Sequence, residues 1–533
     1  MGEAATRQDS GTVAAVAAAL LLLLFGGFFW FPGHTYLQSD TQIYLPILDR
    51  LADPTLYEKD PVALRPHVAY TIYDEAALLL RRLTGLDFQY VLQFQQLVYR
   101  FAGLVGVYLL GRACGLAAPW AVLLASIYGL GATIYGPAVL IAEYEPVPRG
   151  YAVALLMLGV GLAAQERWLA AGCAVGWAIL YHPPTTVPIL VCSAIAIWAT
   201  VQRRAWRAAI PVTVAIALVY LLSKLQAGHT EPQRFFSTIS PGLEQLQQLR
   251  GSYNFVSIWF SRWIGHWLFI LGVAIVAWWR LRAAVPPYVA ALAWGLIAYS
   301  VAVVPASYLL LEKWKWGFMP QFQPVRAILF LALLAMLGAA LNGIRAANWT
   351  SILWFAVAFR LSGSPDWVLI PTLVFLGLGA LTFVALRYWR PALAAVLVLP
   401  FYLIPNVARV SNYPALDHPE IHEAADWARA NTPKDAVFEF ADAGQALYPG
   451  LFRVYSKRAL YVDWKGGGQV NLLEEFADEW WTRWNAVGQQ KQADPAALAA
   501  LGIDYIVVGP KHALAGREPV FRNSKYLVYR LTH

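Results

Sequence analysis

The residues best suited to chemistry lie in a polar stretch at about 32–94, directly after the first long apolar run. Asp40 stands a few residues beyond that run, where a lipid headgroup layer would begin, and its carboxylate can take a proton from a water-borne hydroxyl. Arg65 and His67, in LRPH, are cationic or hydrogen-bonding groups suited to phosphate. Other charged residues of the stretch are expected only to solvate its surface: Asp49, Asp53, Glu58 and Lys59.

A second group of ionisable residues occurs in IAEYEPVPRGYA, where Glu143, Glu145 and Arg149 occupy a very short turn between two apolar runs. Charges so close to hydrocarbon are costly unless they line a cavity or pair with one another. The competing interpretation is a local helix pair between Glu145 and Arg149.

Two further segments carry polar groups at the ends of apolar runs. In YHPPTT, His182 can hydrogen-bond a polar ligand, while the prolines that follow also fit a simple helix end. In LEKWKWGFMPQFQPVR, Lys315 and Arg326 bring cations beside tryptophans, which suits either a clamp on a phosphate or ordinary anchoring at a membrane surface.

Composition shows what surrounds these residues. The 533-residue chain is 59% hydrophobic and only 14% charged, which excludes a water-soluble enzyme and places most of the chain in a membrane. The net charge is +8, but the basic residues form no patch, so we expect no nucleic-acid partner. The 3 cysteines have neither disulfide nor zinc-ligand spacing.

The elements that must position the polar residues are apolar runs of roughly the 17 to 25 residues needed to cross a bilayer. They predict a polytopic α-helical membrane protein with about thirteen spans. The first run lacks a cleavage pattern and is expected to be a retained helix. The runs lie at about 12–31, 95–111, 117–140, 150–164, 168–181, 185–200, 208–224, 264–279, 285–309, 325–343, 349–360, 367–386 and 391–408, of which 117–140 fits either one tilted helix or a span with a re-entrant end.

The excess of arginine in alternate short connections places the N-terminus in the cytoplasm. An odd number of spans then puts the loops at 32–94 and 225–263, and everything from about 410, outside the cell. We therefore expect a transmembrane domain at 1–409 and a small extracytoplasmic α/β domain at 410–533. In the second domain, DHPEIHEAADWARANTPKD predicts a helix, and AVFEF, LFRVYSKRALYV, DYIVVGP and YLVYRLT predict strands. The GGG at 466–468 after Lys465 lacks phosphate-loop spacing and is expected to be a flexible turn.

Taken together, the strings SDTQIYLPILDRLADPTLYEKDP, YEPVPRGYA, LYHPPTT and FQPVRAILF resemble the GT-C superfamily of integral-membrane glycosyltransferases over nearly the whole chain. The resemblance implies transfer of a sugar from a polyprenyl-phosphate carrier to an acceptor on the outer face of the bacterial inner membrane. It implies Asp40 as general base and Glu145, or Glu143, as the second acid. Lipid-phosphate contacts are implied at Arg149, His182 and Arg326. A WWDxG-like motif is missing and Thr41 follows Asp40, so the acceptor, whether glycan, lipid or protein, stays open.

In such a reaction Arg149, Arg326 or Lys315 would stabilise the leaving phosphate, and one attack on the anomeric carbon would invert it. Mg²⁺ or Mn²⁺ bridging Asp40, Glu145 and the phosphate is compatible with these ligands, but nothing in the sequence requires a metal. The main alternative is a multi-pass transporter or flippase of a lipid-linked or polar substrate. Few charges fall within the apolar runs, which disfavours that alternative.

Overall fold

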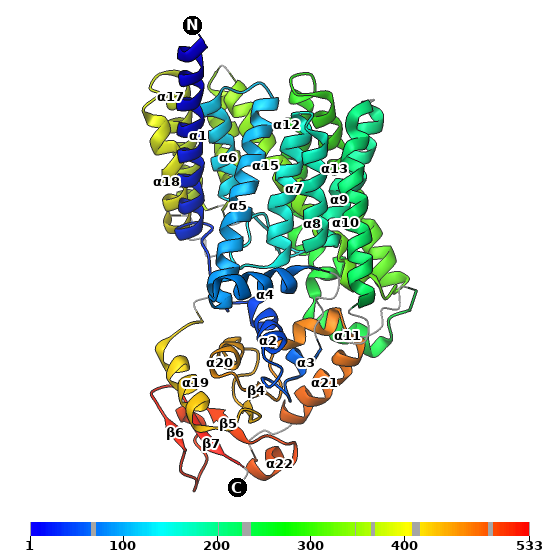
Figure 1. Ribbon diagram of the computed structural model, residues 1–533, viewed down its shortest axis with the longest axis vertical. Helices are drawn as coiled ribbons and strands as arrows, with labels where there is room; N and C mark the ends of the chain where they lie inside the picture. Colours follow the sequence, from blue (N-terminus) through cyan, green and yellow to red (C-terminus); the bar gives the residue numbers. More distant parts are fainter. Residues whose placement is uncertain are drawn as a thin grey trace.

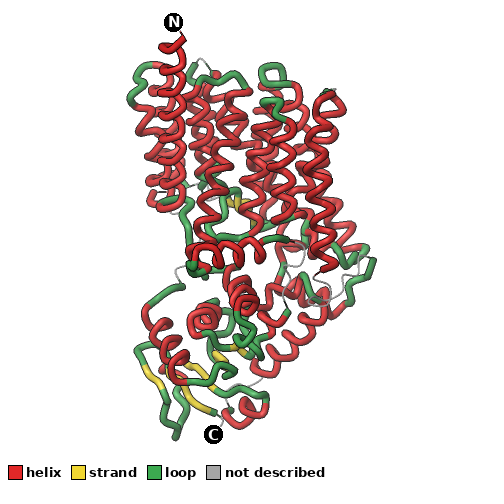
Figure 2. Tube along the Cα trace, in the orientation of Figure 1, coloured by secondary structure: helices red, strands yellow, loops and turns green. Residues whose placement is uncertain are grey.

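The computed structural model is a bundle of helices with a smaller mixed part at the end opposite the N-terminus (Figure 1). Strands are confined to that mixed part and to one short hairpin at the same end of the bundle (Figure 2). The structure describes residues 2–65, 71–200, 202–225, 236–346, 348–363, 368–407, 416–488 and 494–531.

Each apolar run of the sequence coincides with a helix of the bundle. Six segments of the described chain are long and apolar enough to cross a membrane, which confirms the prediction of an integral membrane protein. The number of thirteen spans and the side of the protein that faces the cytoplasm stay predictions. The bundle helices are α1 (Gly2–Phe29), α5 (Phe88–Ala113), α6 (Ala118–Gly129), α7 (Pro148–Ala164), α8 (Trp168–Tyr181), α9 (Pro183–Ala199), α10 (Trp206–Leu225), α12 (Val256–Leu281), α13 (Pro287–Ser307), α15 (Ile328–Arg345), α16 (Thr350–Arg360), α17 (Leu369–Arg387) and α18 (Ala392–Val407).

Close packing in the bundle depends on small residues, as is usual where lipid supplies no hydrophobic driving force between helices. A Cβ on Gly106 of α5 would lie 2.3 Å from the carbonyl oxygen of Met157 in α7, so only glycine allows these backbones to approach. At the centre, every residue of the apolar window of α15 is buried. The close packing therefore fixes the positions of α5 and α7 relative to each other. These two helices flank the polar turn at 141–147.

The run at 117–140 is not one continuous span. Helix α6 ends at Gly129, and the antiparallel strands β1 (Thr133–Ile134) and β2 (Val139–Leu140) follow. Gly136 has φ +95°, and a Cβ there would lie 2.4 Å from the Trp259 ring of α12. A glycine-dependent hairpin thus follows α6 and leads the chain into the turn that holds Glu143 and Glu145.

Short elements lie between the bundle and the mixed part (Figure 1). Helices α2 (Thr41–Ala52), α3 (Pro61–Leu64) and α4 (Tyr73–Thr84) come from the first polar loop, and α11 (Pro241–Arg250) with η2 (Ser252–Asn254) comes from the second. The remaining short elements of the membrane part are η1 (Arg203–Ala205), the π-helix η3 (Tyr308–Lys313), α14 (Met319–Phe322) and η4 (Pro324–Ala327).

The mixed part, called the outer domain here, is a five-stranded sheet in the order β4-β3-β5-β7-β6 with helices around it. Strand β3 runs parallel to β4 and β5, whereas β7 is antiparallel to β5 and β6. Its elements are α19 (Pro419–Asn431), β3 (Val437–Phe440), α20 (Tyr448–Ser456), β4 (Ala459–Leu460), η5 (Gly466–Asn471), α21 (Glu474–Gly488), α22 (Pro495–Ala500), β5 (Tyr505–Val508), η6 (Pro510–His512), β6 (Phe521–Arg522) and β7 (Leu527–Arg530).

The helix expected from DHPEIHEAADWARANTPKD is confirmed as α19, but the strand expected from LFRVYSKRALYV is largely wrong. Its first half lies in helix α20, and only Ala459–Leu460 pair as a strand. Pro449 stands in the first turn of α20, where a missing N–H costs nothing, and Lys457 ends the helix with φ +55°. The apolar run alone does not distinguish a buried helix from a buried strand.

Candidate active site

Asp40 lies at the junction of the bundle and the outer domain, immediately before α2. Its side chain makes no capping hydrogen bond to that helix, so both carboxylate oxygens face other groups. Lys465 of the outer domain donates to Oδ1 over 2.6 Å, and the Arg149 guanidinium lies 4.0 Å from Oδ2. The carboxylate is surrounded by protein on most sides but keeps 38% of its side-chain surface exposed.

These cations set the ionisation of Asp40. Burial opposes the charged form, but Lys465, Arg149 and Arg326 outweigh it and hold the pKa of Asp40 well below its usual range. A carboxylate with so low a pKa is fully ionised at neutral pH, which is the state in which it can accept a proton.

Glu145 is buried and fixes the backbone that carries Asp40. Its Oε1 accepts hydrogen bonds from the backbone N–H of Gln38 at 2.8 Å and of Ser39 at 2.7 Å, and from the Thr41 hydroxyl at 2.8 Å. Its Oε2 accepts from the Thr41 N–H at 3.2 Å. Burial and the nearby Asp40 raise the pKa of Glu145 even so. Through these bonds Glu145 positions the Asp40 loop.

Arg149, in the first turn of α7, pairs with Glu143 and not with Glu145. The two guanidinium contacts to Glu143 Oε1 measure 2.7 Å from Nε and 2.6 Å from Nη2. Gly150 makes this fold-back possible, because a Cβ there would lie 2.8 Å from the Glu143 Cβ. The guanidinium is thereby held beside Asp40.

A cavity of about 430 Å³ brings together three residues expected to contact phosphate: Arg149, His182 and Arg326. His182 stands between α8 and α9, and its Nδ1 accepts from the Thr185 N–H at 3.3 Å while lying 2.9 Å from the Thr185 hydroxyl. The Arg326 guanidinium lies 4.4 Å from the Tyr253 ring centroid, and its buried Nε has no hydrogen-bond partner among the residues that the structure describes. A buried donor without a partner in a cationic cavity favours binding of an anion.

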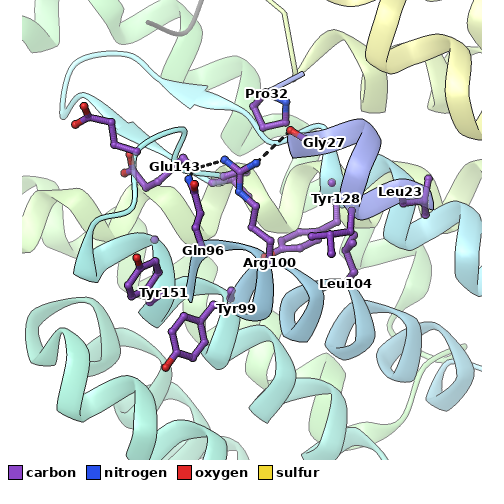
Figure 3. A pocket seen from close by; sticks show the side chains of 17 residues that line it. Leu23, Gly27, Pro32, Gln96, Tyr99, Arg100, Leu104, Tyr128, Glu143 and Tyr151 are labelled. Carbon is purple, nitrogen blue, oxygen red and sulfur yellow. Dashed lines mark hydrogen bonds between the residues drawn. The ribbon is translucent and has the colours of Figure 1, made fainter. Parts of the chain in front are cut away.

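A second cavity, of about 550 Å³, is lined in part by Glu143, the ion-pair partner of Arg149 (Figure 3). Its walls come from α1, α5, α6 and α7 and are mainly apolar, including Leu23 and Leu104. Arg100 of α5 reaches into it and donates to the carbonyl oxygens of Gly27 at 3.1 Å and of Glu143 at 2.5 Å (Figure 3). The Glu143–Arg149 pair thus stands between an apolar cavity and a cationic one.

The structure does not bring every expected residue to these cavities. Arg65 pairs with Glu479 of the outer domain at 3.0 Å, and Lys315 pairs with Glu244 of α11 at 2.7 Å. Neither lines the cavity formed by Arg149, His182 and Arg326. His67 lies outside the described residues.

Sequence reasoning missed two residues of the site, Lys465 and Arg100. Lys465 lies hundreds of residues from Asp40 in the chain, so no local spacing connects them. Arg100 is the one cation inside the apolar run at 95–111, a pattern that marks functional or structural importance in membrane proteins and was a usable signal.

A divalent cation does not fit between Asp40 and Glu145 as they are arranged. N–H and O–H donors already occupy both oxygens of Glu145, and an ammonium occupies one oxygen of Asp40. Within the part of the chain that is described, no group of three His, Cys, Asp or Glu side chains forms a metal cage.

Comparison with family models finds one match, a domain of unknown function (DUF6798), at residues 419–487 of the outer domain. A search of curated proteins returned no match. Among solved structures, ArnT from Cupriavidus metallidurans is similar in its apo state at 16% identity and TM-score 0.42, and in its form bound to undecaprenyl phosphate at 15% identity and TM-score 0.43, each over 98% of both chains. Arabinofuranosyltransferase AftD from Mycobacteria is similar at 16% identity and TM-score 0.45 over 94% of this chain and 35% of that protein.

Because these TM-scores are below 0.5, we transfer no residue roles from these structures.

Proposed function

We propose that this protein is an inverting glycosyltransferase that moves a sugar from a polyprenyl-phosphate carrier to an acceptor on the extracytoplasmic face of the membrane, with Asp40 as general base. The observation that carries the proposal is the cationic cavity of Arg149, His182 and Arg326 immediately beside an accessible carboxylate. A phosphate leaving group and a hydroxyl nucleophile need these two kinds of group, placed side by side.

In the proposed reaction, the acceptor hydroxyl attacks the anomeric carbon as its proton passes to Asp40. The bond between that carbon and the phosphate oxygen breaks, and the phosphate leaves with its electron pair. Arg149 and Arg326 stabilise the charge that develops on it, because guanidinium groups bind phosphate by charge-assisted hydrogen bonds. Attack opposite to the leaving group inverts the anomeric centre.

The apolar cavity is placed to hold the first isoprene units of the carrier. It lies among α1, α5, α6 and α7 and meets the cationic cavity at the Glu143–Arg149 pair. A lipid phosphate entering from the bilayer would therefore have its chain against hydrocarbon side chains and its phosphate against the arginines. Glu143 and Glu145 then act by holding Arg149 and the Asp40 loop in place.

The experiment that tests the proposal is incubation of the protein in nanodiscs with a panel of radiolabelled polyprenyl-phosphate sugars, comparing wild type with Asp40→Asn. We expect the variant to lose transfer by at least about a hundredfold, the scale of general-base catalysis, while its melting temperature changes little. The matched control is Asp53→Asn, a carboxyl at the end of the same helix that accepts hydrogen bonds only from the neighbouring Thr55 among the described residues.

Equal activity of Asp40→Asn and wild type would remove Asp40 from the proposed role. No transfer from any donor, combined with movement of labelled lipid or solute across the bilayer, would support the transporter alternative.

A further inference from the structure

Lys465 reaches the candidate active site from the outer domain, within the segment matched by a domain of unknown function. Its ammonium donates to Asp40 Oδ1 over 2.6 Å and to the Ser39 hydroxyl over 3.0 Å, and only 15% of its side-chain surface is exposed. Ordering and burying a lysine side chain costs free energy. We therefore take the buried Lys465–Asp40 bond as a specific contact of the interface between the bundle and the outer domain.

The glycines at 466–468 fix the position of Lys465, contrary to the flexible turn expected from sequence. They open the short helix η5, and the Gly466 N–H donates to the Asp463 carboxylate at 2.9 Å. A Cβ on Gly466 would lie 2.7 Å from Val62 of the first polar loop, and one on Gly467 would lie 2.5 Å from the Trp480 ring. Gly466 therefore lets the outer domain approach the first polar loop closely enough for Lys465 to reach Asp40, and Gly467 leaves room for Trp480 within the outer domain.

Lys465 and Arg149 approach different oxygens of the Asp40 carboxylate, so together they fix its plane as well as its charge. Other ionisable groups act on Asp40 or on the groups that hold it: Arg326 of η4, Glu143 and Glu145 of the turn before α7, Tyr44 of α2 and His182 before α9. Of the cations, Lys465 alone among the described residues bonds the carboxylate within 3 Å.

We propose that Lys465 is a positioning residue of the active site, supplied by the outer domain, which orients Asp40 and sets its affinity for a proton. This inference rests on the proposed function, in which Asp40 is the general base. It requires the outer domain to be docked on the bundle, because only then does Lys465 hold the Asp40 carboxylate in position. It gives the matched segment of unknown function a role in the chemistry of the membrane domain.

The test measures the proton affinity of Asp40 without using transfer activity. A carbodiimide that reacts with protonated carboxyl groups is applied to the full-length protein in nanodiscs at pH 5.5, and labelling of the Asp40 peptide is followed by mass spectrometry. Removing an adjacent cation raises a carboxyl pKa by about 1 to 3 units, so Lys465→Met should speed labelling at least tenfold. Lys465→Arg should restore slow labelling.

Lys457→Met is the matched control, because Lys457 also belongs to the outer domain and also binds a carboxylate of α2, that of Asp49. It should leave Asp40 labelling within twofold of wild type. Equal acceleration in both variants would show that general loosening of the domain, and not the Lys465 bond, is responsible, and would overturn the inference.

Where transfer is measurable, the acidic limb of the pH profile of kcat/KM should move to higher pH in Lys465→Met, because this limb reports the base of the free enzyme. Transfer that depends on Asp40, with neither labelling nor profile altered by Lys465→Met, would overturn this inference alone. Accelerated labelling in a protein that transfers no sugar would uphold the Lys465–Asp40 relation and overturn the proposed function.

Discussion

Arg326 is the residue whose loss should separate donor binding from chemistry. Its guanidinium lines the cationic cavity and keeps a buried Nε without a partner, so an anionic group would gain a charge-assisted hydrogen bond there. Such a bond contributes about 1.5 to 3 kcal/mol. We therefore expect Arg326→Met to weaken binding of undecaprenyl phosphate by roughly ten- to a hundredfold, measured in nanodiscs.

Arg262→Met, an exposed arginine on α12, is the control and should bind as wild type does. An unchanged Kd in Arg326→Met would place the lipid phosphate elsewhere. Arg326→Lys should fall between the two, since lysine keeps the charge but lacks the planar pair of donors.

At the same scale, Glu145 shows what residue type alone does not reveal. The sequence marked it correctly as an unusual acid next to hydrocarbon, yet its immediate partners are the backbone and hydroxyl of Gln38–Thr41, about a hundred residues earlier. A carboxylate whose oxygens all face N–H and O–H donors is held in one orientation, which suits a support for the neighbouring Asp40 loop.

Among the elements, strand β3 carries a buried acid whose titration should be visible in stability. Glu439 is 3% exposed in the middle of the outer sheet, and burial raises the pKa of Glu439 to about 8 despite the hydrogen bond that it accepts from the Val462 N–H. The folded state therefore binds this proton more tightly than the unfolded state does. The stabilising contribution is complete below the ordinary glutamate pKa and is lost as pH rises through about 8.

We accordingly expect the melting temperature of the outer domain to fall as the pH is raised from 5 to 9. Hydrogen exchange of the β3 amides is the measurement that follows unfolding of this domain. Glu439→Gln should flatten that fall and melt higher than wild type at pH 9, because a neutral amide keeps the shape without a buried charge. Glu518→Gln, on an exposed loop, should keep the wild-type profile. A Glu439→Gln profile as steep as that of wild type would assign the pH dependence to other groups.

Elements also show where prediction from sequence works. The bundle helices follow directly from apolar runs, because lipid requires helices and the run length sets their extent. Helix α20 was expected to be a strand, since a short apolar run lies buried in either form and only Pro449 and the left-handed Lys457 mark the helix. The sequence left open whether the run at 117–140 is one tilted helix or a span with a re-entrant end, and it did not predict the hairpin after α6.

At the scale of the whole molecule, the same limit applies to contacts between distant segments. The sequence indicated Asp40, Arg149, His182 and Arg326 from their places at the ends of apolar runs, and the structure gathers these four. It gave no indication of Lys465 or Arg453, because their partners lie in the first polar loop and no periodicity connects the two parts.

Arg453 offers the sharpest test that the first polar loop and the outer domain form one unit. Its guanidinium lies 3.0 Å from Asp60 of that loop and also pairs with Asp463 beside β4, and all three side chains are at most 3% exposed. Removing one partner leaves buried carboxylates uncompensated, at a cost of about 3 to 5 kcal/mol. Arg453→Met should therefore lower the melting temperature markedly and, by releasing the outer domain, accelerate carbodiimide labelling of Asp40.

Lys59→Met provides the comparison within the same interface, because Lys59 pairs with Asp435 of the outer domain at 2.9 Å but both side chains are 52% exposed. An exposed pair in water contributes little, so this variant should match wild type in melting and in Asp40 labelling. If Arg453→Met also matched wild type, the buried pairs would not hold the two parts together. If it melted lower but left Asp40 labelling slow, Lys465 would stay docked through the glycine contacts of η5 alone, and the interface would consist of two independent halves.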